Sequence, residues 1–184
     1  MIGHGQGMLP FGPRAAEVPE AEMLDLVEDS HEPCPHCGGK ATLSPHRMDR
    51  SKVGVLEALA SLMVQGCPWA RVETGRSVIG IREDGEEIPY STPYRADQHA
   101  MRLTWFGLVE HEKARSARYR ITERGWDFLH GMAQVPAKIL CRQGLVVFQS
   151  AERVRIDQVR GVKLDKAYWD AYPWAEWHQH QAPA

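Results

Sequence analysis

The sequence predicts an α+β fold with one dominant core, because two kinds of apolar periodicity follow one another along its centre. Residues 51–65 repeat apolar side chains every three or four positions, which is typical of an amphipathic helix. Residues 108–121 alternate apolar and polar side chains, as paired strands do. A chain of 184 residues is long enough for one main domain with smaller appendages.

The composition is that of a globular protein, with 43% hydrophobic and 25% charged residues. Membrane spans need about 18 consecutive apolar residues, and no run approaches that length. Residues 1–13 lack the basic start and apolar stretch of a secretory signal, so we expect a cytoplasmic protein without a membrane partner. The formal charge of −2 means that any contact with nucleic acid requires a local basic surface.

The N-terminal residues 1–33 are rich in Gly, Pro and acidic side chains, and we expect most of this arm to be flexible. Its one apolar cluster, residues 23–27, is long enough to dock as a turn of helix or a strand. A zinc-knuckle-like segment over residues 34–47 follows, because Cys34-Pro-His-Cys37-Gly-Gly places two thiols on either side of a tight turn.

Cys34 and Cys37 have the spacing of structural zinc sites, which need four ligands. A second Cys-x-x-Cys pair is absent from the sequence, and His46 is the next candidate ligand along the chain. The other candidates are one histidine and two cysteines, namely His31, Cys67 and Cys141. Zinc bound here would be structural, and its binding would stabilise an N-terminal element that is too small to fold alone. The alternatives are a knuckle without metal and a reactive dithiol.

The helix over residues 51–65 has Asp49 or Ser51 as its N-cap and Gly66 as its stop. Between residues 67 and 93, a β-branched run at 77–82 precedes an Asp-Gly turn, which predicts a strand or short hairpin.

A second helix is predicted over residues 94–106, because Pro93 suits a first turn and Gly107 ends the pattern. One face is apolar and the opposite face is polar, so four side chains should point mainly outward: Arg95, Gln98, His99 and Arg102.

Two strands, 108–112 and 117–121, should then flank residues 113–116, and a helix capped by Thr122 should follow directly. Residues 132–172 predict a small α+β extension: a hairpin of 138–142 with 145–148, a strand at 154–156, and a helix over 165–172. The tail from 173 to 184 has too few apolar residues for a core of its own and should be flexible.

The stretches Leu103-Thr-Trp-Phe-Gly-Leu-Val109 and Arg118-Tyr-Arg-Ile-Thr-Glu-Arg-Gly-Trp-Asp-Phe-Leu129 resemble the second half of winged-helix regulators of the MarR or PadR kind. There a recognition helix, a Gly-Leu-Val strand, a wing and a Tyr-x-Ile-Thr-x-x-Gly junction follow in this order. The resemblance implies a winged helix-turn-helix core over residues 48–131. The chain departs from that pattern between 67 and 93, where a second helix would be expected. The order of segments also resembles small phage and prophage proteins with an N-terminal Cys-x-x-Cys knuckle.

A winged-helix core implies binding to double-stranded DNA and regulation of transcription, with dimerisation common. The helix over 94–106 would enter the major groove and read base edges. Its candidate contacts are Tyr94, Arg95, Gln98, His99 and Arg102. The wing would neutralise phosphates through Lys113, Arg115 and Arg118.

The alternative is a protein-interaction module that docks on a host or phage protein, with the tail residues Trp174 and Trp177 as anchors. It is favoured by four acidic side chains that could neutralise the basic cluster: Glu110, Glu112, Glu123 and Asp127. The sequence contains no phosphate-binding Gly-rich loop, His-Glu-x-x-His or Gly-x-Ser-x-Gly motif, so we do not expect an enzyme.

Overall fold

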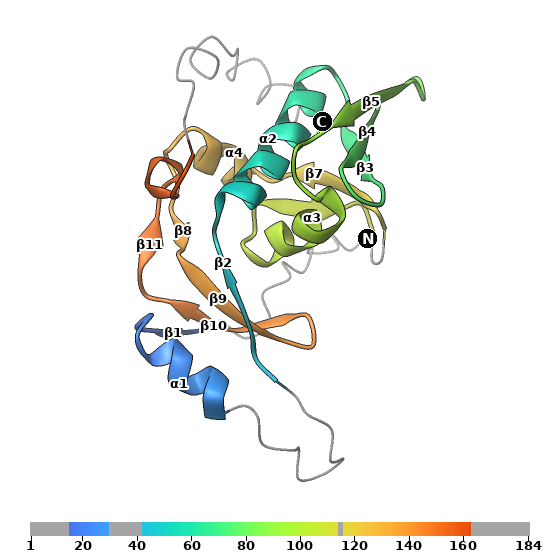
Figure 1. Cartoon of the computed structure of the whole chain (residues 1–184). Helices are drawn as coiled ribbons and strands as arrows, with labels where there is room; N and C mark the ends of the chain where they lie inside the picture. Colours follow the sequence, from blue (N-terminus) through green and yellow to red (C-terminus); the bar gives the residue numbers. More distant parts are fainter. Residues whose placement is uncertain (1–14, 30–41, 114–115, 163–184) are drawn as a thin grey trace, which may run out of the picture.

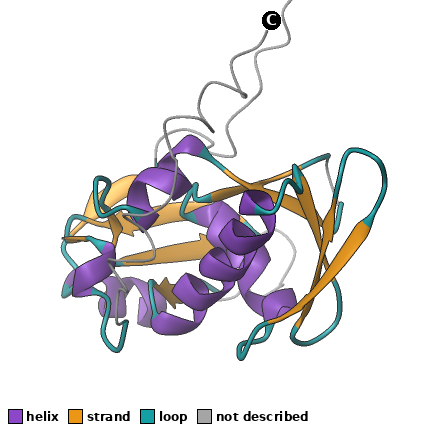
Figure 2. Ribbon diagram, turned by 90° about the horizontal axis from the view of Figure 1, so that it is seen from above, coloured by secondary structure: helices purple, strands orange, loops and turns teal. Residues whose placement is uncertain are grey.

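The computed structural model describes residues 15–29, 42–113 and 116–162, which form a mixed α+β fold, as predicted (Figure 1). Four α-helices and three sheets are present in this part of the chain. The helices gather in the middle of the molecule with strands on both sides (Figure 2).

Helix α2 (Arg50–Val64) forms the centre of the main core, and the predicted helix over 51–65 is confirmed. Asp49 is its N-cap, with a side-chain oxygen that accepts a hydrogen bond from the backbone N–H of Lys52 at 3.1 Å. Gly66, with a φ of 82°, allows the chain to leave the helix. The buried face of α2 packs against four strands of a five-stranded sheet.

That sheet has the strand order β5-β4-β3-β7-β6, and every neighbouring pair is antiparallel. Strands β4 (Ser77–Ile81) and β5 (Glu87–Ser91) form the hairpin expected from the Asp-Gly turn. The preceding β3 (Trp69–Val72) joins this hairpin to β7 (Arg118–Ile121). Residues 67–93 thus contain three strands and no helix: the predicted hairpin is confirmed, and β3 is a further strand that the pattern did not predict.

Helix α3 (Ala96–Trp105), strand β6 (Val109–His111), β7 and helix α4 (Glu123–Leu129) follow in the predicted order. Thr122 caps α4, because its hydroxyl accepts the backbone N–H of Gly125 at 3.1 Å. Helix α3 begins two residues later than the sequence predicts. Arg95 occupies its N-cap position, and Tyr94 lies before the helix.

A second sheet, of order β1-β10-β9-β2, joins the strand near the start of the described chain to the β9–β10 hairpin. Its strands are β1 (Ala16–Val18), β2 (Ser44–Arg47), β9 (Lys138–Arg142) and β10 (Leu145–Ser150), and β1 runs parallel to β10. Helix α1 (Glu22–Asp29) lies beside this sheet (Figure 1). The apolar cluster predicted at 23–27 is therefore helical.

Strands β8 (Val135–Pro136) and β11 (Arg153–Val154) form a small antiparallel pair, which the short 3₁₀ helix Ile156–Gln158 follows. The predicted hairpin of 138–142 with 145–148 is confirmed as β9 and β10, and the predicted strand at 154–156 is found only at its start. The predicted helix over 165–172 and the tail with Trp174 and Trp177 lie outside the described residues.

Candidate nucleic-acid interface

Helix α3 has one face in the core and one face outside. Ala100, Leu103 and the following Phe106 are completely or almost completely buried against α2 and β6. On the opposite side, Gln98 is exposed and Met101 retains 48% of its accessible surface. Because this outer face is held by a rigid core, the structure presents it to any large partner.

Beside the outer face, α3 meets the start of α2 and the end of β2 in a cluster of nitrogen-bearing side chains. Lys52 is only 3% exposed, and its ammonium pairs with Asp49. Arg102 is half-buried nearby, and no carboxylate of the described residues lies within 4 Å of its guanidinium. We call six residues of this region the α3 surface: His46, Lys52, Arg95, Gln98, His99 and Arg102.

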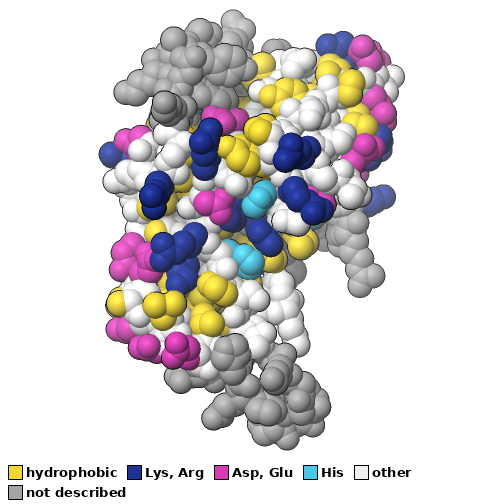
Figure 3. Space-filling view, viewed as in Figure 1, with side chains coloured by type: hydrophobic (Ala, Val, Ile, Leu, Met, Phe, Trp, Pro, Cys, Tyr) yellow, Lys and Arg dark blue, Asp and Glu magenta, His cyan; other side chains and the backbone are white. Residues whose placement is uncertain are grey.

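The two histidines report on the positive charge of the α3 surface. Burial, together with the charges of Arg102 and Lys52, lowers the pKa of His46 to about 4. Burial also lowers the pKa of His99, and Lys52 acts in the same direction. Histidine side chains lie near the centre of the face that α3 occupies, and Lys and Arg gather around them (Figure 3). The field at His46 is therefore positive, whereas at His99 the carboxylates of Asp49 and Asp97 oppose the charges of Lys52 and Arg102.

At the start of α3, the two expected contacts have different surroundings. Arg95 is exposed and forms an ion pair with Asp97 at 2.7 Å, and this hydrogen bond lowers the pKa of Asp97 to about 2. Tyr94, a candidate contact from the sequence, is half-buried, and its ring lies against the backbone of α2 at Gly54. The reason is that Gly54 has no side chain to keep the ring away.

The wing between β6 and β7 presents less free positive charge than the sequence suggests. Arg118 pairs with Glu112 at 3.2 Å, and Arg120 pairs with Glu110. Lys113 is exposed, and no acidic partner within 4 Å is found for it in the described part of the chain. Arg115 lies outside the described residues.

The candidate zinc ligands fall in different places. Cys34, Cys37 and His31 lie outside the described residues. His46 is on β2, with its ring centre 4.7 Å from that of Trp105 on α3. Cys67 and Cys141 are buried, and burial raises the pKa of the Cys141 thiol to about 12. Among the described residues, no group of three or more His, Cys, Asp or Glu side chains could hold a metal ion.

Sequence reasoning did not select Lys52 as part of this interface. A signal was present, because Lys52 stands three residues after the N-cap Asp49, where the two side chains share one face of the helix. A charged residue among the apolar positions Val53, Val55 and Leu56 also stands out in an otherwise buried helix face.

Comparison with models of protein families, with curated proteins and with solved structures finds no match for this chain. In the described residues, none of the helices has the length and apolar character needed to cross a membrane.

Proposed function

We propose that this protein binds double-stranded DNA through the α3 surface and regulates transcription as a phage-related winged-helix protein. The succession of α3, β6, β7 and α4 supports this proposal, because a recognition helix, wing and following helix would have this order. The observation that carries it is Arg102, whose charge lacks an acidic partner within 4 Å among the described residues, whereas the charge of the neighbouring Lys52 is compensated by Asp49. Uncompensated positive charge beside an exposed helix face attracts phosphates.

The side chains of the α3 surface suit different parts of a duplex. Gln98 can pair with adenine edges in the major groove, and the guanidinium of Arg102 can contact a backbone phosphate beside it. Arg95 and Lys113 are exposed cations that can contact backbone phosphates and fix the register. Arg118 contributes less, because Glu112 already occupies its guanidinium. Two copies of the chain would read two half-sites.

Arg102→Ala is expected to weaken DNA binding by about tenfold and to reduce the salt dependence of the affinity by about one phosphate contact. The measurement is fluorescence anisotropy with labelled duplexes of mixed sequence at two salt concentrations. The low salt concentration is measured first, because the attraction between cationic side chains and DNA phosphates is strongest at low salt.

The matched control is Arg142→Ala. Arg142 is also exposed, and no acidic partner within 4 Å is described for it, but it lies at the tip of the β9–β10 hairpin. Its removal changes the net charge equally and should leave the affinity almost unchanged. Equal losses in both variants would mean that the chain attracts DNA by overall charge, and the α3 surface would then lose its assigned role.

A second candidate function is docking on a protein partner through the same surface. Two observations favour it: Met101 is 48% exposed in the middle of α3, and Glu110 and Glu112 neutralise the wing arginines. Exposed methionines adapt well to apolar partners. Absence of DNA binding at low salt would support this second candidate over the first.

We also propose that Cys34 and Cys37 bind a structural zinc ion. Protein purified without chelators should contain about one zinc per chain by elemental mass spectrometry, and the variant Cys34→Ser with Cys37→Ser should lose it. Replacing His46 by Gln in the same assay tests whether this histidine is a ligand. A wild-type protein with only traces of zinc would rule this site out.

A further inference from the structure

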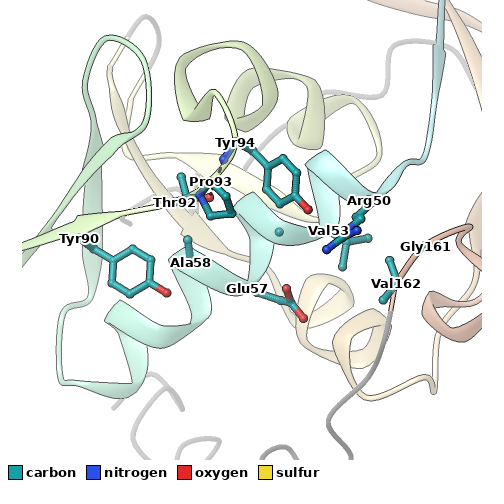
Figure 4. A pocket seen from close by; sticks show the side chains of 11 residues that line it. Arg50, Val53, Glu57, Ala58, Tyr90, Thr92, Pro93, Tyr94, Gly161 and Val162 are labelled. Atoms are coloured by element: carbon teal, nitrogen blue, oxygen red, sulfur yellow. Dashed lines mark hydrogen bonds between the residues drawn. The ribbon is translucent and has the colours of Figure 1, made fainter.

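A cleft of about 410 Å³ opens beside α2 (Figure 4). Its floor is α2 at Gly54 and Ala58, and its walls come from β5, residues 92–94 and residues 161–162. Segments distant in sequence therefore meet around one space. A volume of this size suits a small molecule.

The shape of the cleft depends on Gly54. A Cβ atom at this position would collide with the ring of Tyr94, so the ring lies directly on the helix backbone. The neighbouring Thr92 holds the backbone at Tyr94, because its hydroxyl accepts the backbone N–H of Tyr94 at 3.3 Å. Tyr94 forms one wall of the cleft, and its ring and that of Tyr90 offer apolar surfaces to an occupant (Figure 4).

Two charged groups of the cleft also lack strong partners. The half-buried carboxylate of Glu57 has no hydrogen bond or ion pair with another described side chain, and burial raises its pKa. The guanidinium of Arg50 has no carboxylate within 4 Å in the described chain, although its charge lowers the pKa of Glu57. Desolvating a charged group without a partner is costly, so the half-buried Glu57 would gain from a ligand, and the exposed Arg50 is free to contact one.

The spacing of these charges limits the ligand. Arg50 and Glu57 are two turns apart on the same side of α2, which corresponds to about 10 Å along the helix axis. A simple cation would be attracted by Glu57 but repelled by Arg50. A simple anion would be attracted by Arg50 but repelled by Glu57. A molecule with a cationic group at one end and an anionic group at the other satisfies both.

We propose that this cleft binds a small zwitterion of about dipeptide size, with its ammonium on Glu57, its carboxylate on Arg50 and an apolar body against Tyr90 and Tyr94. The site is separate from the α3 surface, and its test does not depend on DNA binding. Charge-assisted hydrogen bonds at both ends would orient the ligand, and the tyrosine rings would select an apolar side chain.

The probe is glycyl-leucine, added to the full-length protein up to about 10 mM, a concentration that detects weak affinity. Backbone amide signals of Gly54, Ala58 and Gly161 are expected to shift in NMR spectra as the dipeptide saturates the cleft. Glu57→Gln, which keeps the shape but removes the charge, should weaken binding by about tenfold. Glu83→Gln, in the exposed turn of the β4–β5 hairpin, is the matched control and should bind as wild type does.

Two further probes keep the test independent of any folding defect in the variants. On the wild-type protein, N-acetyl-glycyl-leucine lacks the ammonium and glycyl-leucine amide lacks the carboxylate, so each should bind about tenfold more weakly. Equal binding of all three probes, or no shift of the cleft amides by glycyl-leucine, would overturn the proposal.

Discussion

Gly125→Ala is expected to lower the free energy of unfolding by about 3 kcal/mol, although alanine normally favours helices by about 1 kcal/mol over glycine. Gly125 lies in α4, where a Cβ atom would collide with the carbonyl oxygen of Leu108 and come within 2.6 Å of Ile121 Cγ2. That carbonyl accepts the backbone N–H of Thr122 at 3.1 Å, so it cannot move without breaking the junction of β7 and α4.

Gly54→Ala is the matched control, because Gly54 is also a helical glycine without room for a Cβ atom. There the obstacle is the half-buried ring of Tyr94, which can rotate toward solvent. The gain in helix propensity then offsets the lost packing, and the stability should change by less than about 1 kcal/mol. Urea denaturation of both variants measures the difference. Similar losses in the two variants would contradict the distinction between a fixed carbonyl and a mobile ring.

The collision at Gly125 also gives a physical reason for one part of the winged-helix resemblance. In the segment Tyr119-Arg-Ile-Thr-Glu-Arg-Gly125, the threonine caps the helix and the glycine allows the helix to touch the start of β6. The pattern therefore specifies a close strand-to-helix junction. It specifies no ligand, and for this reason it predicts local structure better than function.

The elements that could be predicted from the sequence are those with local signals. Helix α2 has a strong apolar repeat and a cap at Asp49, and the β4–β5 hairpin has its Asp-Gly turn. The pairing of β1 with β10 had no such signal, because the partners Val18 and Ser150 are far apart in the chain and β1 is only three residues long. Periodicity identifies a strand but not its partner.

The candidate interface could be predicted only in part, because periodicity shows which face of a helix is buried but not what packs against it. The helical repeat correctly placed Ala100, Leu103 and Phe106 in the core. It therefore also placed the opposite, polar face of α3 on the outside. It did not place the ring of Tyr94, because the position of that ring is decided by Gly54 on α2. A glycine inside a strong helical repeat was a usable signal, since such glycines often allow a close approach.

Met23→Ala is expected to detach α1 and β1 from the rest of the protein, with a local loss of about 2–4 kcal/mol. Met23 is fully buried in a small core with Leu43 and Leu140, apart from the main core around α2. A helix of eight residues is not stable alone, so α1 depends on this contact.

Hydrogen exchange can separate this local effect from global unfolding. The backbone N–H of Ala151 donates to the carbonyl of Val18 at 2.8 Å, and its exchange should accelerate strongly in Met23→Ala. Amides in the middle of α2 should keep their protection, because they belong to the other core. Leu24→Ala, next to Met23 but 61% exposed, is the matched control and should change neither set. If α2 lost protection together with Ala151, the two cores would unfold as one unit, and residues 15–29 would be an integral part of the main fold.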